Sequence, residues 1–225
     1  MATSAESSTI TLWDVASQRR KGAPLRGHRS VVNAVAFGPG GRRLASADPN
    51  DVRVWDLRAA GGPSVKRVIR QAAVLSVVFS ADGRTLASAD ESGAIRLTRL
   101  ASGGTSGLLR VADAAVFGMA FSPDGRILIA GDEAGKITIW DVADRRRLGE
   151  PGRQGGSVNH VAVSPGGRTF ATTGDGFSAR LWSHVIWRDE DELRAAICEL
   201  VGAGLSRAEW NQYAPGIEYR RVCDE

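Results

Sequence analysis

Short segments in which apolar and polar residues alternate run along most of the chain, and one of them recurs with little change. It reads ITLWD, VRVWD, IRLTR, ITIWD and ARLWS in five successive copies. Alternation with a period of two residues is typical of a strand that buries one face. The fourth position of each copy recurs at intervals of 42 or 43 residues, at Trp13, Trp55, Thr98, Trp140 and Trp182. The pattern therefore predicts five copies of one structural unit.

Two further features recur at this interval and define the rest of the unit. A second apolar strand ends at Phe37, Phe79, Phe121 and, in the last copy, Val163. The turns that follow read GPGGR, SADGR, SPDGR and SPGGR, and their Gly and Asp residues suit tight connections between strands. No helical period separates the strands. We expect an all-β protein in which small antiparallel sheets repeat around an axis.

The unit resembles the WD40 repeat, most closely in the copy framed by Gly27-His28 and Trp55-Asp56. The resemblance covers residues 1–183, which we expect to form one domain of β-propeller blades. It also implies a buried hydrogen-bonded network in which His28, Ser46 and Trp55 join an aspartate from the intervening loop.

The loop aspartate of this network departs from the family pattern. Pro49 occupies its usual place, which leaves Asp48 or Asp51 as a substitute. The other copies lack the histidine of the GH dipeptide and carry Gln71, Asp113 and Gly155 nearby. We therefore expect most of the other blades to depend on packing rather than on this network.

The first copy is shorter than the others at its N-terminal side. MATSAESSTITLWD aligns with LIAGDEAGKITIWD, so that Met1 corresponds to Leu128 and the innermost strand of the first blade is absent. The chain then has one partial and four fuller units, fewer than the seven blades usual in the family. We expect an incomplete propeller that belongs to a longer protein, or one whose open edges associate with a second copy.

Residues 184–225 form a second region, a C-terminal tail in which the period becomes helical. We expect an amphipathic helix over 189–202, because apolar residues follow the spacing of one helix face at Leu193, Ala196, Ile197, Leu200 and Val201. A second short helix is expected to start at Ser206, which has capping-box spacing to Glu209, and to end before Pro215. The tail resembles the terminal motif that follows WD40 arrays in large multidomain bacterial proteins.

Composition restricts the class of protein further. The net charge of +4 is modest for 225 residues, and no stretch has the apolar length of a membrane helix or the pattern of a signal peptide. A cytoplasmic location is expected. Both cysteines, Cys198 and Cys223, lie in the tail, where they either pair or stay reduced; we favour the reduced form.

Candidate chemistry is sparse. His160 and His184 have no second ligand at metal spacing, and the glycine clusters lack the spacing of a phosphate-binding loop. His28 and Ser46 lack the sequence context of a hydrolytic triad. We expect no metal, no cofactor and no enzymatic activity.

Two sets of charged residues recur with the repeat and are separated by one strand. Acidic residues follow the second strand of each unit, and basic residues precede it. If the units stack as blades, the two sets lie at opposite ends of the strands. The alternative interpretation is that both sets of residues only form turns and solvated rims. The acidic face is the candidate partner-binding face (Asp48, Asp90, Asp132 and Asp175), and the other is basic (Arg42, Arg84, Arg126 and Arg168).

These observations favour a non-catalytic scaffold or sensor module that binds a protein or peptide, as the C-terminal part of a larger bacterial signalling protein. A propeller enzyme is one alternative, although the innermost strands carry no inward acid. A nucleic-acid-binding module is another, although the arginine turns lack aromatic residues for stacking on bases.

Overall fold

The computed structural model describes residues 1–4, 8–102, 104–111 and 114–183. The helices expected over 189–202 and from Ser206, together with Cys198 and Cys223, lie outside these residues. The described chain is all-β, as predicted: it holds eighteen strands and one 3₁₀ turn, Pro39–Gly41. Within these ranges no helix has the length and apolar character needed to cross a membrane.

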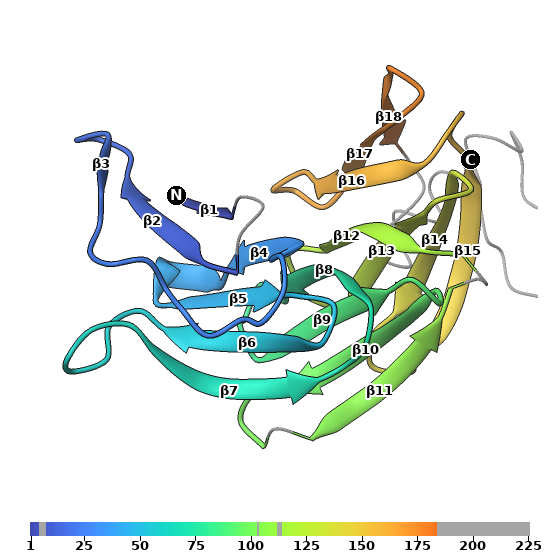
Figure 1. The fold of residues 1–225 in the computed structure, drawn as a ribbon. Helices are drawn as coiled ribbons and strands as arrows, with labels where there is room; N and C mark the ends of the chain where they lie inside the picture. The colour runs from blue at the N-terminus through green and yellow to red at the C-terminus, as the bar shows by residue number, and fades with distance from the viewer. Residues whose placement is uncertain (5–7, 103, 112–113, 184–225) are drawn as a thin grey trace, which may run out of the picture. The chain divides into compact units, whose positions relative to one another are not determined.

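The strands form five antiparallel sheets that follow one another in chain order (Figure 1). The first sheet has three strands, β1 (Ala2–Ser4), β2 (Ile10–Asp14) and β3 (Arg19–Arg20). The second has four, β4 (Ala34–Phe37), β5 (Arg43–Ala47), β6 (Asp51–Asp56) and β7 (Ser64–Arg70).

The third sheet also has four strands, β8 (Val74–Phe79), β9 (Thr85–Asp90), β10 (Ala94–Arg99) and β11 (Thr105–Arg110). The fourth contains β12 (Val116–Phe121), β13 (Ile127–Asp132), β14 (Lys136–Asp141) and β15 (Arg146–Arg153). The fifth contains β16 (Val158–Val163), β17 (Thr169–Gly174) and β18 (Ala179–Ser183). The last unit, predicted as a fuller copy, thus has three strands among the described residues.

Each full sheet is a meander in which consecutive strands are neighbours, as the tight turns predicted. The pairing register repeats: Leu44 lies opposite Trp55, Leu128 opposite Trp140 and Phe170 opposite Trp182. Because side chains alternate between the two faces of a strand, this common register sends equivalent residues to the same face in every sheet. The aromatic marker of the sequence therefore has one structural position.

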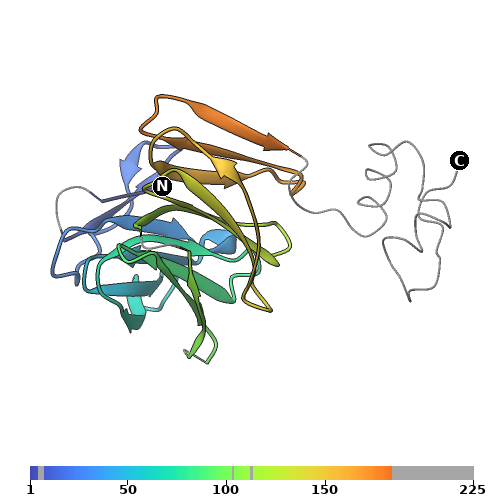
Figure 2. The same cartoon turned by 90° about the vertical axis from the view of Figure 1, so that its right-hand side faces the viewer.

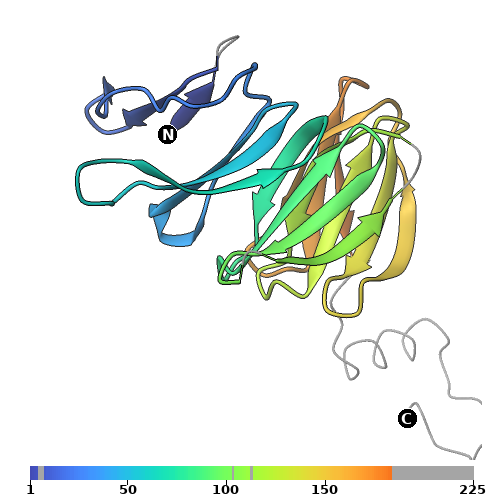
Figure 3. The ribbon, with the colours of Figure 1, turned by 60° about the horizontal axis from the view of Figure 1, so that its bottom comes forward.

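The apolar core lies between successive sheets. Contacts join β4 to β8, β8 to β12 and β12 to β16, so the inner strands of the last four blades lie next to one another, and β1 of the first sheet contacts β4. Figure 2 and Figure 3 show the sheets facing each other in this succession. Ile10 and Leu12 of the first sheet pack with Leu44 and Trp55 of the second. A larger cluster between the third and fourth sheets includes Leu97, Met119 and Trp140. Each internal blade thus buries its apolar faces against its neighbours.

Candidate functional site

A buried network of hydrogen bonds in the second blade links the loop before β4 to strands β5 and β6. Ser46 on β5 is fully buried, and its Oγ lies 2.6 Å from Nε2 of His28 and accepts a 2.8 Å bond from Nε1 of Trp55 on β6. The other ring nitrogen of His28, Nδ1, lies 3.1 Å from Oδ2 of Asp48. A neutral imidazole with its proton on Nδ1 places that proton toward Asp48 and can accept the Ser46 hydroxyl proton at Nε2, although the contact between Nδ1 and Asp48 lacks the geometry of a hydrogen bond.

Electrostatics favour the neutral imidazole. Desolvation by burial lowers the pKa of His28 more than the nearby Asp48 carboxylate raises it. Burial also opposes ionisation of Asp48, yet the backbone N–H groups of Asn50 and Asp51, at 2.8 and 2.9 Å, outweigh it and the pKa of Asp48 is lowered. The network therefore holds an ionised aspartate beside a neutral histidine.

His28, Asp48 and Asp51 also form a cluster of side-chain types that can bind a metal ion. The negative charges of the two aspartates are already compensated by neighbouring groups. Asp51 forms ion pairs with Arg53 at 3.0 Å and with Arg70 at 3.3 Å. Backbone N–H groups of four residues point to Asp48. The arginines disfavour a cation at this position, so the arrangement suits a structural role.

The order Asp48, His28, Ser46 has the connectivity of a hydrolytic triad. Ser46 is 0% exposed and its Oγ already accepts the Trp55 indole proton. A substrate carbonyl cannot reach that oxygen in this structure. The geometry thus gives these residues a place in the blade interior rather than at a reaction site.

Glutamine replaces the histidine in two other blades, contrary to the expectation that these blades depend on packing alone. Ser88 Oγ donates to Oε1 of Gln71 at 2.5 Å. In the last blade Thr172 Oγ1 donates to Gln154, and Trp182 Nε1 donates to Thr172 Oγ1 at 3.0 Å. A glutamine amide reaches the same hydroxyl as an imidazole and can both donate and accept. The spacing of 17 or 18 residues to the serine or threonine, shared with His28 and Ser46, is the signal in the sequence.

In the fourth blade a different side chain accepts the tryptophan indole proton. Ala130 occupies the position of Ser46, and Trp140 Nε1 instead donates to Thr138 Oγ1 on its own strand at 3.1 Å. In the third blade Thr98 takes the place of the tryptophan and is 1% exposed. Its Oγ1 has no hydrogen-bond partner among the described residues. The blades thus differ in how they satisfy their buried polar groups.

The four aspartates of the candidate partner-binding face do not share one environment. Asp48 and Asp132 are each 1% exposed, and Asp90 is half-buried. Their carboxylates accept backbone N–H groups of the following turn, for example Ala94 N at 3.1 Å from Asp90 and Lys136 N at 2.9 Å from Asp132. A partner cannot contact the buried pair, whose carboxylates bond the following turns, so of the candidate partner-binding face only Asp90 and Asp175 are accessible.

Asp175 is exposed, but it is not structurally equivalent to the other three. Val74 pairs with Asp90 and Val116 with Asp132, whereas Val158 pairs with Gly174. A Cβ at Gly174 would lie 1.5 Å from the carbonyl oxygen of Ser157, which excludes any other residue there. The aspartate therefore follows one position later, where it accepts a 2.6 Å bond from Nδ2 of Asn159.

The four arginines are all exposed, at the opposite ends of the strands from the aspartates. Arg42 pairs with Asp56 at 3.1 Å, and Arg84 lies 4.0 Å from Asp82. The Arg126 backbone N donates to Asp124. Arg168 occupies the same turn position in the last blade. The structure thus leaves the basic set at the surface while it buries half of the acidic set.

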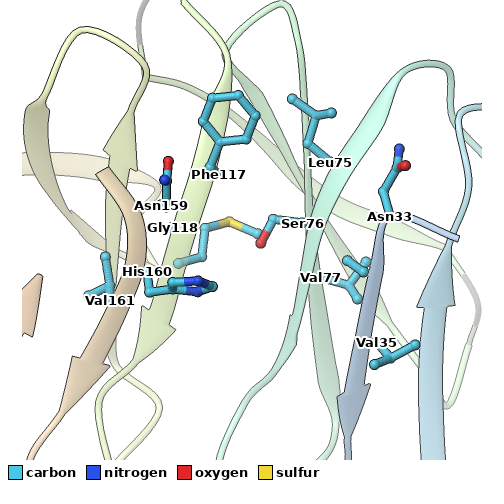
Figure 4. A pocket seen from close by; sticks show the side chains of 12 residues that line it. Asn33, Val35, Leu75, Ser76, Val77, Phe117, Gly118, Asn159, His160 and Val161 are labelled. Atoms are coloured by element: carbon cyan, nitrogen blue, oxygen red, sulfur yellow. The ribbon is translucent and has the colours of Figure 1, made fainter. Parts of the chain in front are cut away.

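A pocket of about 450 Å³ lies on the inner face of strands β4, β8, β12 and β16 (Figure 4). Its lining residues occur at steps of 42 in three levels. The first is Asn33, Leu75, Phe117 and Asn159; the second is Ala34, Ser76, Gly118 and His160; the third is Val35, Val77, Met119 and Val161. Sequence reasoning treated these strands only as lacking an acid, although the repeat interval itself identifies the three levels.

Register shifts shape the first level. The pairing of the inner strand slips at Leu75, Phe117 and Asn159 in the last three blades. An extra residue in a strand re-aims its side chain, and bulges are common beside binding sites. The side chains of this level lie together at one end of the pocket in Figure 4, which we call the pocket mouth: Asn33, Leu75, Phe117 and Asn159.

The successive antiparallel sheets, their inner strands side by side around a lined pocket, define a β-propeller architecture with five blades. The family model described as WD domain, G-beta repeat matches residues 19–56, 64–99, 103–141 and 148–183, more than half of the chain. The chain therefore belongs to the WD40 family. This fold is a typical scaffold for protein interactions. A comparison with curated proteins finds no match.

Proposed function

We propose that this chain is a non-catalytic interaction module that binds a protein or peptide partner at the pocket mouth. The proposal rests on the pocket, because four inner strands present equivalent residues around a cavity of about 450 Å³. Ligand sites in proteins are concave and combine apolar walls with a few polar groups. The repeat thus supplies a built recess rather than a flat surface.

The chemistry of the mouth fits a neutral or weakly polar peptide segment. Leu75 and Phe117 are half-buried, which leaves part of each side chain available for apolar contact. Asn33 donates through Nδ2 to the Val74 carbonyl at 2.9 Å, and Asn159 is fixed by its bond to Asp175. Amides held in place in this way can form hydrogen bonds with a peptide backbone at little entropic cost.

The same lining argues against the enzyme alternative. The twelve residues that line the pocket include no aspartate or glutamate. His160 is exposed and Ser76 half-buried, and both point into the cavity in Figure 4. Neither is oriented by a hydrogen bond to a carboxylate among the described residues, as a catalytic histidine usually is. This supports binding over catalysis.

A second proposal concerns self-association through the last blade. Leu181 on β18 is 72% exposed, whereas its equivalents Val54, Leu97 and Ile139 are at most 4% exposed because the next blade covers them. The outer face of the last sheet therefore presents apolar positions that are buried elsewhere in the chain. A second copy that packs a blade on this face would bury them.

We propose further that the module works in the cytoplasm as the scaffolding or sensing end of a larger bacterial signalling protein. The support is the resemblance of residues 184–225 to the terminal motif of large bacterial WD40 proteins. An interaction module without chemistry of its own suits that arrangement.

The pocket-mouth proposal is tested by affinity capture and mass spectrometry with the full chain. Phe117→Ser removes apolar contact at the mouth, and Leu108→Ser is its control, because Leu108 is 55% exposed on outer strand β11. We expect a partner recovered with the unchanged protein to be lost with Phe117→Ser and kept with Leu108→Ser. Equal recovery with both variants, or no partner with the unchanged protein, contradicts the proposal.

A further inference from the structure

The turns that carry the repeated arginines also form the rim of a second, apolar pocket. This pocket has a volume of about 360 Å³ and lies where β8, β12 and β16 end. Its walls come from three equivalent turns, which contribute Ala81, Pro123 and Pro165. The turn pocket shares Met119 and Val161 with the third level of the first pocket, whereas the mouth lies at the other end of the same strands.

The position of charge around this turn pocket follows from the repeat. In each turn an arginine follows the lining residue by three positions, so Arg84, Arg126 and Arg168 belong to the three turns that wall the pocket, although none of them is among its lining residues. All three are exposed. Three exposed arginines in the turns that wall one recess favour a ligand that is both acidic and apolar.

The neighbouring carboxylates accept hydrogen bonds within the turns. Asp82 accepts a 2.6 Å bond from Ser80 Oγ and a 2.9 Å bond from the backbone N of Arg84. Asp124 accepts the equivalent bonds from Ser122 and from the backbone N of Arg126. The Arg84 guanidinium reaches Asp82 only at 4.0 Å and is 86% exposed. The Arg84 side chain thus extends into solvent beside the Asp82 carboxylate, which is 58% exposed.

The floor of the pocket distinguishes between acidic partners. Phe79 and Phe121 contribute to it but are only 7% and 9% exposed, so their ring faces are not available for stacking. Single-stranded nucleic acids depend on such stacking together with basic side chains. A recess of this kind instead suits an aliphatic or aromatic side chain of a peptide.

We propose that the turn pocket binds an acidic peptide segment with an apolar anchor residue, the anchor lying between Ala81, Pro123 and Pro165 and the acidic flanks contacting Arg84, Arg126 and Arg168. The inference rests on the proposed function as an interaction module, but it assigns a second surface and the chemistry of its partner. The two surfaces allow one chain to connect two partners.

The test measures fluorescence anisotropy of a labelled peptide of eight glutamates around a central leucine–phenylalanine pair, titrated with the full chain at low ionic strength. We expect replacement of that pair by two serines to weaken binding about tenfold. Arg126→Glu should weaken binding of the original peptide about tenfold as well, through charge repulsion. Arg110→Glu, an equal change of net charge at an exposed site of β11, should weaken it less than about twofold.

Specific outcomes overturn the proposal. Equal binding of the leucine–phenylalanine and serine peptides excludes the anchor, and equal loss with Arg126→Glu and Arg110→Glu shows attraction by net charge alone. Tighter binding of a labelled oligothymidylate of equal charge, with the same loss in Arg126→Glu, assigns the face to nucleic acid. Phe117→Ser should leave peptide binding unchanged, so failure at the pocket mouth and failure at the turn pocket are told apart.

Discussion

At the scale of single residues, the blades use different side chains for one task. Histidine in the second blade and glutamine in the third and fifth all bond a buried hydroxyl at the same structural position. Satisfying that hydroxyl matters more than the identity of the partner, because an unpaired buried polar group costs about 1–3 kcal/mol. His28 differs from the glutamines in one respect: it titrates.

The first prediction follows from this difference. Burial lowers the pKa of His28 in the folded chain, whereas in the unfolded chain it stays near its ordinary value of about 6.5. The unfolded state therefore binds more protons as the pH falls below that value, and folding stability decreases. In urea unfolding between pH 7 and pH 5, we expect His28→Gln to lose less stability than the unchanged protein.

Its control is His28→Ala, which leaves Ser46 and Asp48 without their partner and should cost about 3 kcal/mol at pH 7, against about 1 kcal/mol for His28→Gln. An equal pH dependence in the unchanged protein and His28→Gln would show that His28 does not carry the effect. His160 and His184 are present in both proteins and cancel in the comparison.

At the scale of elements, the third strand determines how the marker residue is accommodated in the third and fourth blades. Thr98 and Thr138 are both buried on third strands, on β10 and β14. Thr138 Oγ1 accepts the Trp140 indole proton and lies 3.4 Å from the Ala130 carbonyl, whereas Thr98 Oγ1 has no partner in the described part of the chain. The two threonines form a natural pair for comparison.

We predict opposite effects of the same substitution at these two sites. Thr98→Val removes an unpaired buried hydroxyl and keeps the shape, so it should raise the free energy of unfolding by about 1 kcal/mol. Thr138→Val removes the acceptor of the Trp140 indole and should lower it by about 1–2 kcal/mol. Chemical denaturation with tryptophan fluorescence measures both. A loss of stability in Thr98→Val would refute the idea that its hydroxyl is unsatisfied.

At the scale of the whole molecule, each internal blade is covered on both faces while the last sheet leaves Leu181 exposed. We predict concentration-dependent association in sedimentation velocity that Leu181→Lys reduces, because a charge on this face opposes burial against a second copy. Leu108→Lys places the same charge on outer strand β11 and should leave the association unchanged. A monomer at all concentrations would contradict self-association through this face.

The sequence by itself determined the number of blades, the order and approximate limits of their strands, and the turn positions of the repeated charges. These features follow from local alternation, turn chemistry and a constant interval, which need no knowledge of neighbouring blades. The placement of His28 near Ser46 and Trp55 came from resemblance to the WD40 family. The exposure of Arg42, Arg84, Arg126 and Arg168 agrees with their place in tight turns.

Only the tertiary structure decided which polar residues remain accessible. Asp48 and Asp132 recur at the same interval as the arginines, yet the neighbouring backbone surrounds them. Close approach of Ser157 to Gly174 shifts Asp175 out of register, and the register of the inner strands brings residues 42 apart around one pocket. Burial and juxtaposition depend on how separate blades pack, and that packing is a property of the assembled propeller rather than of any one repeat.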